Sequence, residues 1–318
     1  MEPISLHRRL VRIAVGGAIF VAAPYVLSEH YVTVLISAAI YTVITVGLNI
    51  FMGYTGQISF GHNAFAAIGG YASAILATRL GMPPLIALLV AAALAALAAA
   101  VVGYPTLRLR GHYLAMATLS FGLITFEVST QWRGLTEGPF GISAIPPLGV
   151  GSWELSSDPQ FFYAYWIIAG LSVWAARRIR GARIGRAFRA IAGSEEAAGA
   201  LGVNVAGFKL LAFVISAVYA SVGGSMFAHY VTYISPEVFG SYMVVLLFTM
   251  IFVGGIGTAY GPLLGAVAIT ILPEVLRGAT EIRELIYGAL LLLILLFAPR
   301  GLSGLRNTRL FALLPRWI

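Results

Sequence analysis

The chain has 318 residues, of which 59% are hydrophobic and 10% are charged, and its mean hydropathy is +0.91. Soluble domains carry about 25% charged residues, so the composition excludes an ordinary soluble protein and indicates an all-α integral membrane protein. The absence of cysteine excludes disulfides and thiolate metal sites. The net charge of +8 sits mainly between apolar runs, which is typical of loops beside a lipid bilayer and does not indicate binding of nucleic acid.

Ten apolar segments predict about ten transmembrane helices in a single domain over residues 1–318. They cover residues 11–27, 31–51, 63–78, 84–103, 112–130, 161–176, 207–228, 241–256, 262–275 and 284–298. With a cytoplasmic N-terminus, most of the 20 basic residues fall in cytoplasmic segments, including all those of residues 177–209. Because Lys and Arg concentrate in cytoplasmic loops, we expect both termini inside and residues 131–160 to form the longest outer loop.

A glycine-rich segment at residues 53–61 separates the second and third apolar runs. Glycine disfavours a continuous helix, and irregular backbone at membrane depth is tolerated only where it is buried in protein or lines a wet cavity. Two interpretations stay open: a break between half-helices that lines a solute pathway, or a plain cytoplasmic turn. The candidate pathway residues here are Gly53, Thr55, Gly56, Gln57, Ser59, Gly61 and His62.

Glu127 and Glu274 are acidic residues that lie inside apolar runs. Charged groups in hydrocarbon are costly and suggest a function, but both lie toward the predicted outer ends of their helices. Glu127 is therefore a candidate pathway residue, with a position at the wet membrane interface as the alternative. The histidines are widely spaced, so no metal site is predicted.

Residues 177–209 form the longest charged segment of the chain. Within it, residues 185–191 predict a short amphipathic helix in which arginines flank Phe188. Ser194 is expected to cap a second helix with two glutamates in its first turn and a glycine at its end. A basic helix on anionic lipid headgroups is one interpretation, but the small, acidic second helix favours docking to another protein. The candidate docking residues are Arg186, Arg189, Glu195, Glu196, Ala197, Ala198 and Gly202.

A second glycine-rich segment covers residues 254–265 and separates two short apolar runs. A tight turn whose glycines permit close helix packing is one interpretation, and a second pathway segment is the other. Two glycine-interrupted segments, one in each half of the chain, are typical of transporters with broken helices. The candidate pathway residues are Gly254, Gly255, Gly257 and Thr258.

No nucleotide-binding motif is present, because the single lysine, Lys209, follows Phe208 and no Gly-Lys-Ser/Thr phosphate-binding loop occurs. No catalytic constellation is recognisable either. We therefore expect a chain that is not an enzyme and that has no catalytic residue, metal or cofactor of its own. If ATP drives the protein, another subunit binds it.

Four motifs are distinctive along the chain: Asn49-Ile-Phe-Met-Gly-Tyr-Thr-Gly-Gln-Ile-Ser-Phe-Gly-His62, Arg108-Leu-Arg-Gly-His-Tyr-Leu-Ala-Met-Ala-Thr-Leu119, Gly254-Gly-Ile-Gly-Thr258 with Gly261-Pro262, and Pro299-Arg-Gly-Leu302. They closely resemble the LivM-type permease subunits of branched-chain amino acid ABC importers. The resemblance runs over about residues 30–304. It implies a multi-pass permease of a bacterial inner membrane that pairs with a homologous LivH-type permease, two cytoplasmic ATP-binding subunits and a periplasmic solute-binding protein.

The string Glu196-Ala197-Ala198-x-x-x-Gly202 is similar to the EAA coupling loop of ABC import permeases, which assigns residues 186–202 to the ATPase. The further Ile-x-Leu-Pro of that signature is missing.

Two other departures from the family pattern bear on the solute. Leu123 stands where many relatives have a glutamate, and Glu137 replaces a glycine of the family's Thr-Gly-Gly-Pro-x-Gly segment.

These observations lead us to expect a permease subunit of an ATP-driven importer for branched-chain amino acids or a related small polar or amphipathic solute. Permeases that resemble this one also serve urea, short amides and aromatic acids, so the solute itself is not predicted. The alternative is a secondary transporter that works alone on an ion gradient, which would require ionisable groups at mid-membrane. A membrane scaffold is a third class, but it would leave both glycine-rich breaks without a purpose.

Overall fold

The computed structural model describes residues 20–150, 153–275 and 301–304. Its long helices are α2 (Glu29–Leu48), α3 (His62–Arg79), α4 (Pro84–Thr106), α5 (His112–Gln131), α7 (Asp158–Gly181), α10 (Val205–Val231), α11 (Ser241–Gly254) and α12 (Gly261–Val275). The short elements are the π-helix η1 (Asn49–Gly53), α6 (Arg133–Thr136), the 3-10 helices η2 (Gly138–Phe140) and η3 (Pro236–Phe239), α8 (Arg183–Gly193), α9 (Glu195–Ala200) and α14 (Gly301–Gly304). The strands β1 (Gly149–Val150) and β2 (Trp153–Glu154) form a small antiparallel ladder.

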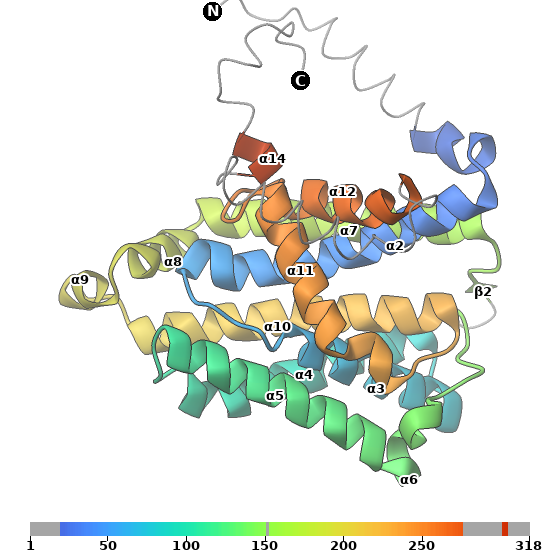
Figure 1. Ribbon diagram of the computed structural model, residues 1–318, viewed down its shortest axis with the longest axis horizontal. Coiled ribbons are helices and arrows are strands. Elements are labelled where there is room, and N and C mark those ends of the chain that lie inside the picture. Colours follow the sequence, from blue (N-terminus) through green and yellow to red (C-terminus); the bar gives the residue numbers. More distant parts are fainter. Residues whose placement is uncertain (1–19, 151–152, 276–300, 305–318) are drawn as a thin grey trace, which may run out of the picture.

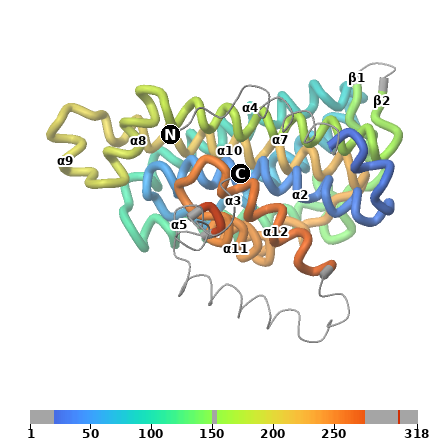
Figure 2. Tube along the Cα trace, turned by 90° about the horizontal axis from the view of Figure 1, so that it is seen from above, coloured from blue at the N-terminus to red at the C-terminus, as the bar shows by residue number. Residues whose placement is uncertain are grey.

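The long helices run side by side along the longest axis of the molecule, while α11 crosses them obliquely (Figure 1). Helix α10 packs against α2, α3 and α4, and α12 packs against α2 and α11. Helices α8 and α9 lie at one end, and β1, β2 and α6 lie at the other (Figures 1 and 2). The two ends therefore carry the two segments that the sequence places on opposite sides of a membrane.

Small residues explain how α10 approaches its neighbours so closely. A Cβ atom added to Gly69 of α3 would overlap Ser221 of α10, and one added to Gly224 of α10 would overlap Ala66 of α3. Close backbone approach through small residues is the usual basis of helix packing in lipid. Lipid tails are as apolar as the side chains, so burial of apolar surface does not favour association of the helices. The glycines of these helices thus serve packing.

Five helical stretches in the described part of the chain are long and apolar enough to cross a membrane. They are Glu29–Gly53, Pro84–Thr106, His112–Gln131, Val205–Val231 and Pro236–Gly254. Residues 63–78, 161–176 and 262–275, also predicted as spans, are helical as parts of α3, α7 and α12. The segment 284–298 and most of 11–27 lie outside the described residues, so the count of ten and the side of each terminus stay predictions. The described helices are consistent with a multi-pass helical membrane protein.

Candidate functional site

Much of the first glycine-rich segment is buried inside the protein, although Gly56 is exposed. Helix α2 widens into the π-helix η1, and residues 56–61 then follow as irregular backbone that leads to the first residue of α3. Thr55, Ser59 and Gly61 are buried. The polar groups of the segment bond locally, to α5 and to α9. The backbone N–H of Phe60 donates to Oγ1 of Thr118 over 3.0 Å. Broken backbone held by protein groups is the arrangement that a membrane interior tolerates.

Asn49 joins the two glycine-rich segments, which lie far apart in the sequence. Its side-chain Nδ2 donates to the carbonyl oxygen of Thr258 over 2.8 Å, and its Oδ1 accepts from the N–H of Gly257 over 2.7 Å. The side chain is 1% exposed. Asn49 belongs to a motif that resembles the family, but it was not among the site residues expected from the sequence. Its position as an amide within an apolar run was the signal that could have found it.

Glycines allow the backbones of the two segments to touch at this junction. A Cβ atom added to Gly53 would overlap Oδ1 of Asn49 and would lie 2.5 Å from the amide nitrogen of Gly257. Gly255 and Gly257 have φ values of 110° and 73°, a region that side chains disfavour. The hydroxyl of Thr258 donates to the carbonyl of Gly255 over 2.7 Å, which closes the turn before α12. Both glycine-rich segments therefore form one buried junction.

The segment predicted to dock on another protein forms two helices, as expected. In α8, Phe188 is buried and packs against Phe208 of α10, whereas Arg186 and Arg189 are exposed. In α9, Oγ of Ser194 accepts from the N–H of Ala197 over 3.2 Å, so the predicted cap is confirmed.

The end of α9 also follows the expectation. Gly202 adopts a φ of 82° just after the helix, as the expected terminator should. Ala198 is buried, while Ala197, Glu196 and Gly202 are exposed at the end of the molecule, where α9 projects (Figure 2). The exposed side of α9 is thus available to another protein.

Glu195 connects the docking helices to the first glycine-rich segment. Its Oε1 accepts from Nε2 of Gln57 and from Nζ of Lys209, each over 2.9 Å. Its Oε2 lies 3.4 Å from Nε of Arg110. Gly56, with a φ of 71°, also lies against Ala192 of α8. Gln57 and Glu195 were expected in two separate sites, and the structure brings these two side chains into contact.

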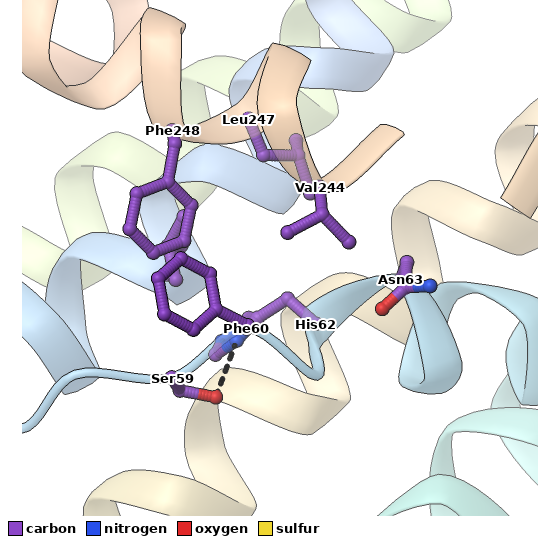
Figure 3. Close-up of a pocket in the computed structure, with 8 residues that line it drawn as sticks. Ser59, Phe60, His62, Asn63, Val244, Leu247 and Phe248 are labelled. Carbon is purple, nitrogen blue, oxygen red and sulfur yellow. Dashed lines mark hydrogen bonds between the residues drawn. The ribbon is translucent and has the colours of Figure 1, made fainter. Parts of the chain in front are cut away.

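A narrow crevice lies where the first glycine-rich segment meets α11 (Figure 3). The rings of Phe60 and Phe248 stack with centroids 4.4 Å apart and planes at 16°. Oγ of Ser59 lies 3.4 Å from Nδ1 of His62, and the crevice is too narrow for a water molecule. Its lining residues are Leu48, Ser59, Phe60, His62, Asn63, Val244, Leu247 and Phe248. The two phenylalanines stack at this crevice, and neither was among the site residues expected from the sequence.

Glu127 is not brought to this site by any contact in the described part of the chain. It is exposed on α5, where its Oε2 accepts from Nε2 of Gln131 over 3.0 Å. That setting fits the alternative of an interface residue better than a place in the buried junction. Within the described residues no group of His, Asp and Glu side chains could hold a metal ion.

Comparison with known proteins identifies the family. Residues 30–297 match the family described as "Branched-chain amino acid transport system / permease component". The chain belongs to this family. It is 32% identical over 313 residues to the high-affinity branched-chain amino acid transport system permease protein LivM of Escherichia coli (strain K12), covering 91% of this chain and 74% of that protein.

A second relative is the permease protein LivH of the same kind of system in Salmonella typhimurium. It is 31% identical over 283 residues, which cover 83% of this chain and 91% of LivH. A third is a probable LivM of Methanocaldococcus jannaschii, 22% identical over 324 residues. No solved structure matches the chain. The resemblance to LivM-type permeases seen in the motifs is confirmed, and the roles of the individual residues stay predictions.

Proposed function

We propose that this chain is one permease subunit of an ABC importer that moves branched-chain amino acids, or a related small solute, across a bacterial inner membrane. Its partners are a homologous LivH-type permease, two cytoplasmic ATP-binding subunits and a periplasmic solute-binding protein. The observation that carries the proposal is membership of the permease family over residues 30–297. The likeness to both LivM and LivH supports a pair of related permeases.

The buried junction is the proposed wall of the pathway on this subunit. Two glycine-rich breaks meet through Asn49, and the first break leads directly to the crevice behind Phe60 and Phe248. Apolar walls with a few neutral polar groups suit a solute that has an aliphatic side chain and polar ends. Alternating access requires that the closed arrangement exchange with an open one, and only differential contacts of the partners with the two states can drive that exchange.

Helix α9 is the proposed docking element for an ATP-binding subunit. Leu201, just after α9, is 83% exposed, although an apolar side chain of this size gains free energy from burial. The small residues around it leave room for a groove of another protein to close over the helix. The ATP-binding subunit then supplies the nucleotide chemistry, and this chain supplies no cofactor site.

Cysteine-directed crosslinking of the assembled importer tests the docking proposal. The natural chain has no cysteine, so a Leu201→Cys variant carries the only thiol of this subunit. We expect a thiol-attached photo-crosslinker at this position to capture an ATP-binding subunit. The matched control is Phe140→Cys, because Phe140 is 85% exposed but belongs to η2, near α6 at the opposite end (Figure 1). Capture from Phe140→Cys and none from Leu201→Cys would refute the proposal.

A further inference from the structure

We propose that Glu195 is a positioning residue that transmits the movement of α9 to the first glycine-rich segment. This inference rests on the proposed function, because it assumes that an ATP-binding subunit moves α9. The carboxylate of Glu195 couples the movement of the docking helix α9 to that of the first glycine-rich segment. The mechanical link runs through Gln57 and Lys209, neither of which lies in α9.

The carboxylate of Glu195 is shared among three separate parts of the chain. Gln57 comes from the glycine-rich segment, Lys209 comes from α10, and Arg110 comes from the connection between α4 and α5. The bonds from Gln57 and Lys209 are both 2.9 Å long and end on the same oxygen, Oε1. A displacement of α9 therefore pulls on the glycine-rich segment and on α10 at the same atom.

Burial makes this link hard to break. The side chain of Lys209 is 2% exposed and that of Glu195 is 17% exposed. In the described part of the chain, Glu195 is the ion-pair partner of Lys209. Separating the two would leave a buried ammonium group without a counter-charge, which is strongly unfavourable. The low-energy response to a push on α9 is therefore a joint movement of α9 with its buried partners.

The neighbouring Glu196 provides a contrast within the same helix turn. Its side chain is 84% exposed, and its one described contact is a 3.4 Å approach to Arg110, which is itself 66% exposed. An exposed pair of this kind contributes little to stability and constrains position weakly. The sequence similarity to a coupling loop pointed to Glu196, but the buried contacts belong to Glu195.

The link continues from Gln57 toward the crevice. Ser59 and Phe60 follow within three residues, and both line the crevice at which the rings of Phe60 and Phe248 stack. Gly56 lies against Ala192 of α8, so the same segment touches both docking helices. A shift at Gln57 thus reaches the aromatic stack through a short piece of backbone, without any other helix in between.

The test compares Glu195→Gln with Glu154→Gln in the complete importer in proteoliposomes, each measured for assembled complex, ATP hydrolysis and solute uptake. Glutamine keeps the shape and removes the charge. We expect Glu195→Gln to hydrolyse ATP while its ratio of solute moved to ATP hydrolysed falls clearly below that of wild type. Glu154, an exposed glutamate of β2 at the opposite end of the molecule, is the control, and Glu154→Gln is expected to keep the wild-type ratio. Equal ratios in wild type and Glu195→Gln would overturn the inference.

A double variant, Glu195→Gln with Lys209→Met, distinguishes a role in coupling from a purely structural role. This variant removes the stranded ammonium group, so we expect the amount of assembled complex to return to the wild-type level while the ratio stays low. Recovery of the ratio along with assembly would show that the pair serves folding alone and would overturn the inference. Failure of the proposed function looks different, because wild-type protein would then show no ATP-dependent uptake in the same assay.

Discussion

The amide oxygen of Asn49 accepts a hydrogen bond of 2.7 Å from the backbone N–H of Gly257, 208 residues further along the chain. The same side chain donates to the carbonyl oxygen of Thr258, so one residue satisfies two backbone groups of the second glycine-rich segment. The end of α2 and the turn before α12 are thereby held as one unit. The Asn49 contact is the structural basis for treating the two breaks as a single site.

Asn49→Leu tests this contact. Leucine has a similar size but forms no hydrogen bond, so two partly buried backbone groups lose their partner, at a cost of about 1–3 kcal/mol. We expect a lower thermal unfolding temperature of the purified complex and reduced transport. Asn204→Ala is the control, because Asn204 bonds one exposed backbone group at the start of α10. Transport equal to wild type in Asn49→Leu, with no larger thermal loss than in Asn204→Ala, would contradict the account.

Gly53→Ala tests the close approach at the same junction. The added methyl group would overlap Asn49 and crowd Gly257, and overpacking of this kind costs about 1–3 kcal/mol. We expect reduced stability and transport. Gly170→Ala, in α7, adds the same methyl group where no atom lies within 4 Å of it. That variant should be neutral or slightly stabilising, since alanine favours a helix over glycine by about 1 kcal/mol. Indistinguishable behaviour of the two variants would count against tight packing at Gly53.

Glu137 adopts a backbone conformation that favours glycine, with a φ of 63°. Its ion pair with Arg79, at 3.5 Å, is exposed and adds little stability. Glu137→Gly relieves the strain but increases the freedom of the unfolded chain, so we expect a change within about 1 kcal/mol. Glu137→Val should lower the unfolding temperature clearly, because a β-branched side chain is poorly accommodated at positive φ. Thermal unfolding of both variants checks this order, and the reverse order would contradict it.

Removal of one ring from the aromatic stack should open the crevice. Phe60→Ala leaves Phe248 without its partner and creates a space where the closed conformation admits no water. We expect a rise in solute flux without ATP in proteoliposomes that contain the complete importer. Phe227→Ala is the control, because Phe227 packs edge to face on Phe239 outside the crevice lining. An equal solute flux without ATP in Phe60→Ala and Phe227→Ala would show that the aromatic stack does not close the crevice.

The local features of the docking segment could be predicted from the sequence because their causes lie within a few residues. Ser194 caps the helix that follows it, Phe188 is the buried residue between exposed arginines, and Gly202 takes the left-handed conformation. Each depends on helix geometry and on the chemistry of neighbouring side chains. The family was likewise recognisable from motifs alone.

The contacts that organise the site could not be predicted in this way. Asn49 pairs with Gly257, and Glu195 pairs with Gln57 over 138 positions, so both depend on how α2, α10 and the second glycine-rich segment pack in three dimensions. The π-helix η1 was also not predicted, because a widened helix turn leaves no periodic signal in an apolar run. Residues 53–61 could be read from the sequence as a break that lines a pathway or as a turn, and the choice of a pathway segment stays a prediction.

The most direct test of the central claim is uptake of a radiolabelled branched-chain amino acid into proteoliposomes. The compared preparations contain this chain alone or this chain with its partner permease, the two ATP-binding subunits and the solute-binding protein. The account predicts accumulation only in the complete assembly and only with ATP. Accumulation by this chain alone, driven by a proton or sodium gradient and indifferent to ATP, would contradict the account and establish a secondary transporter.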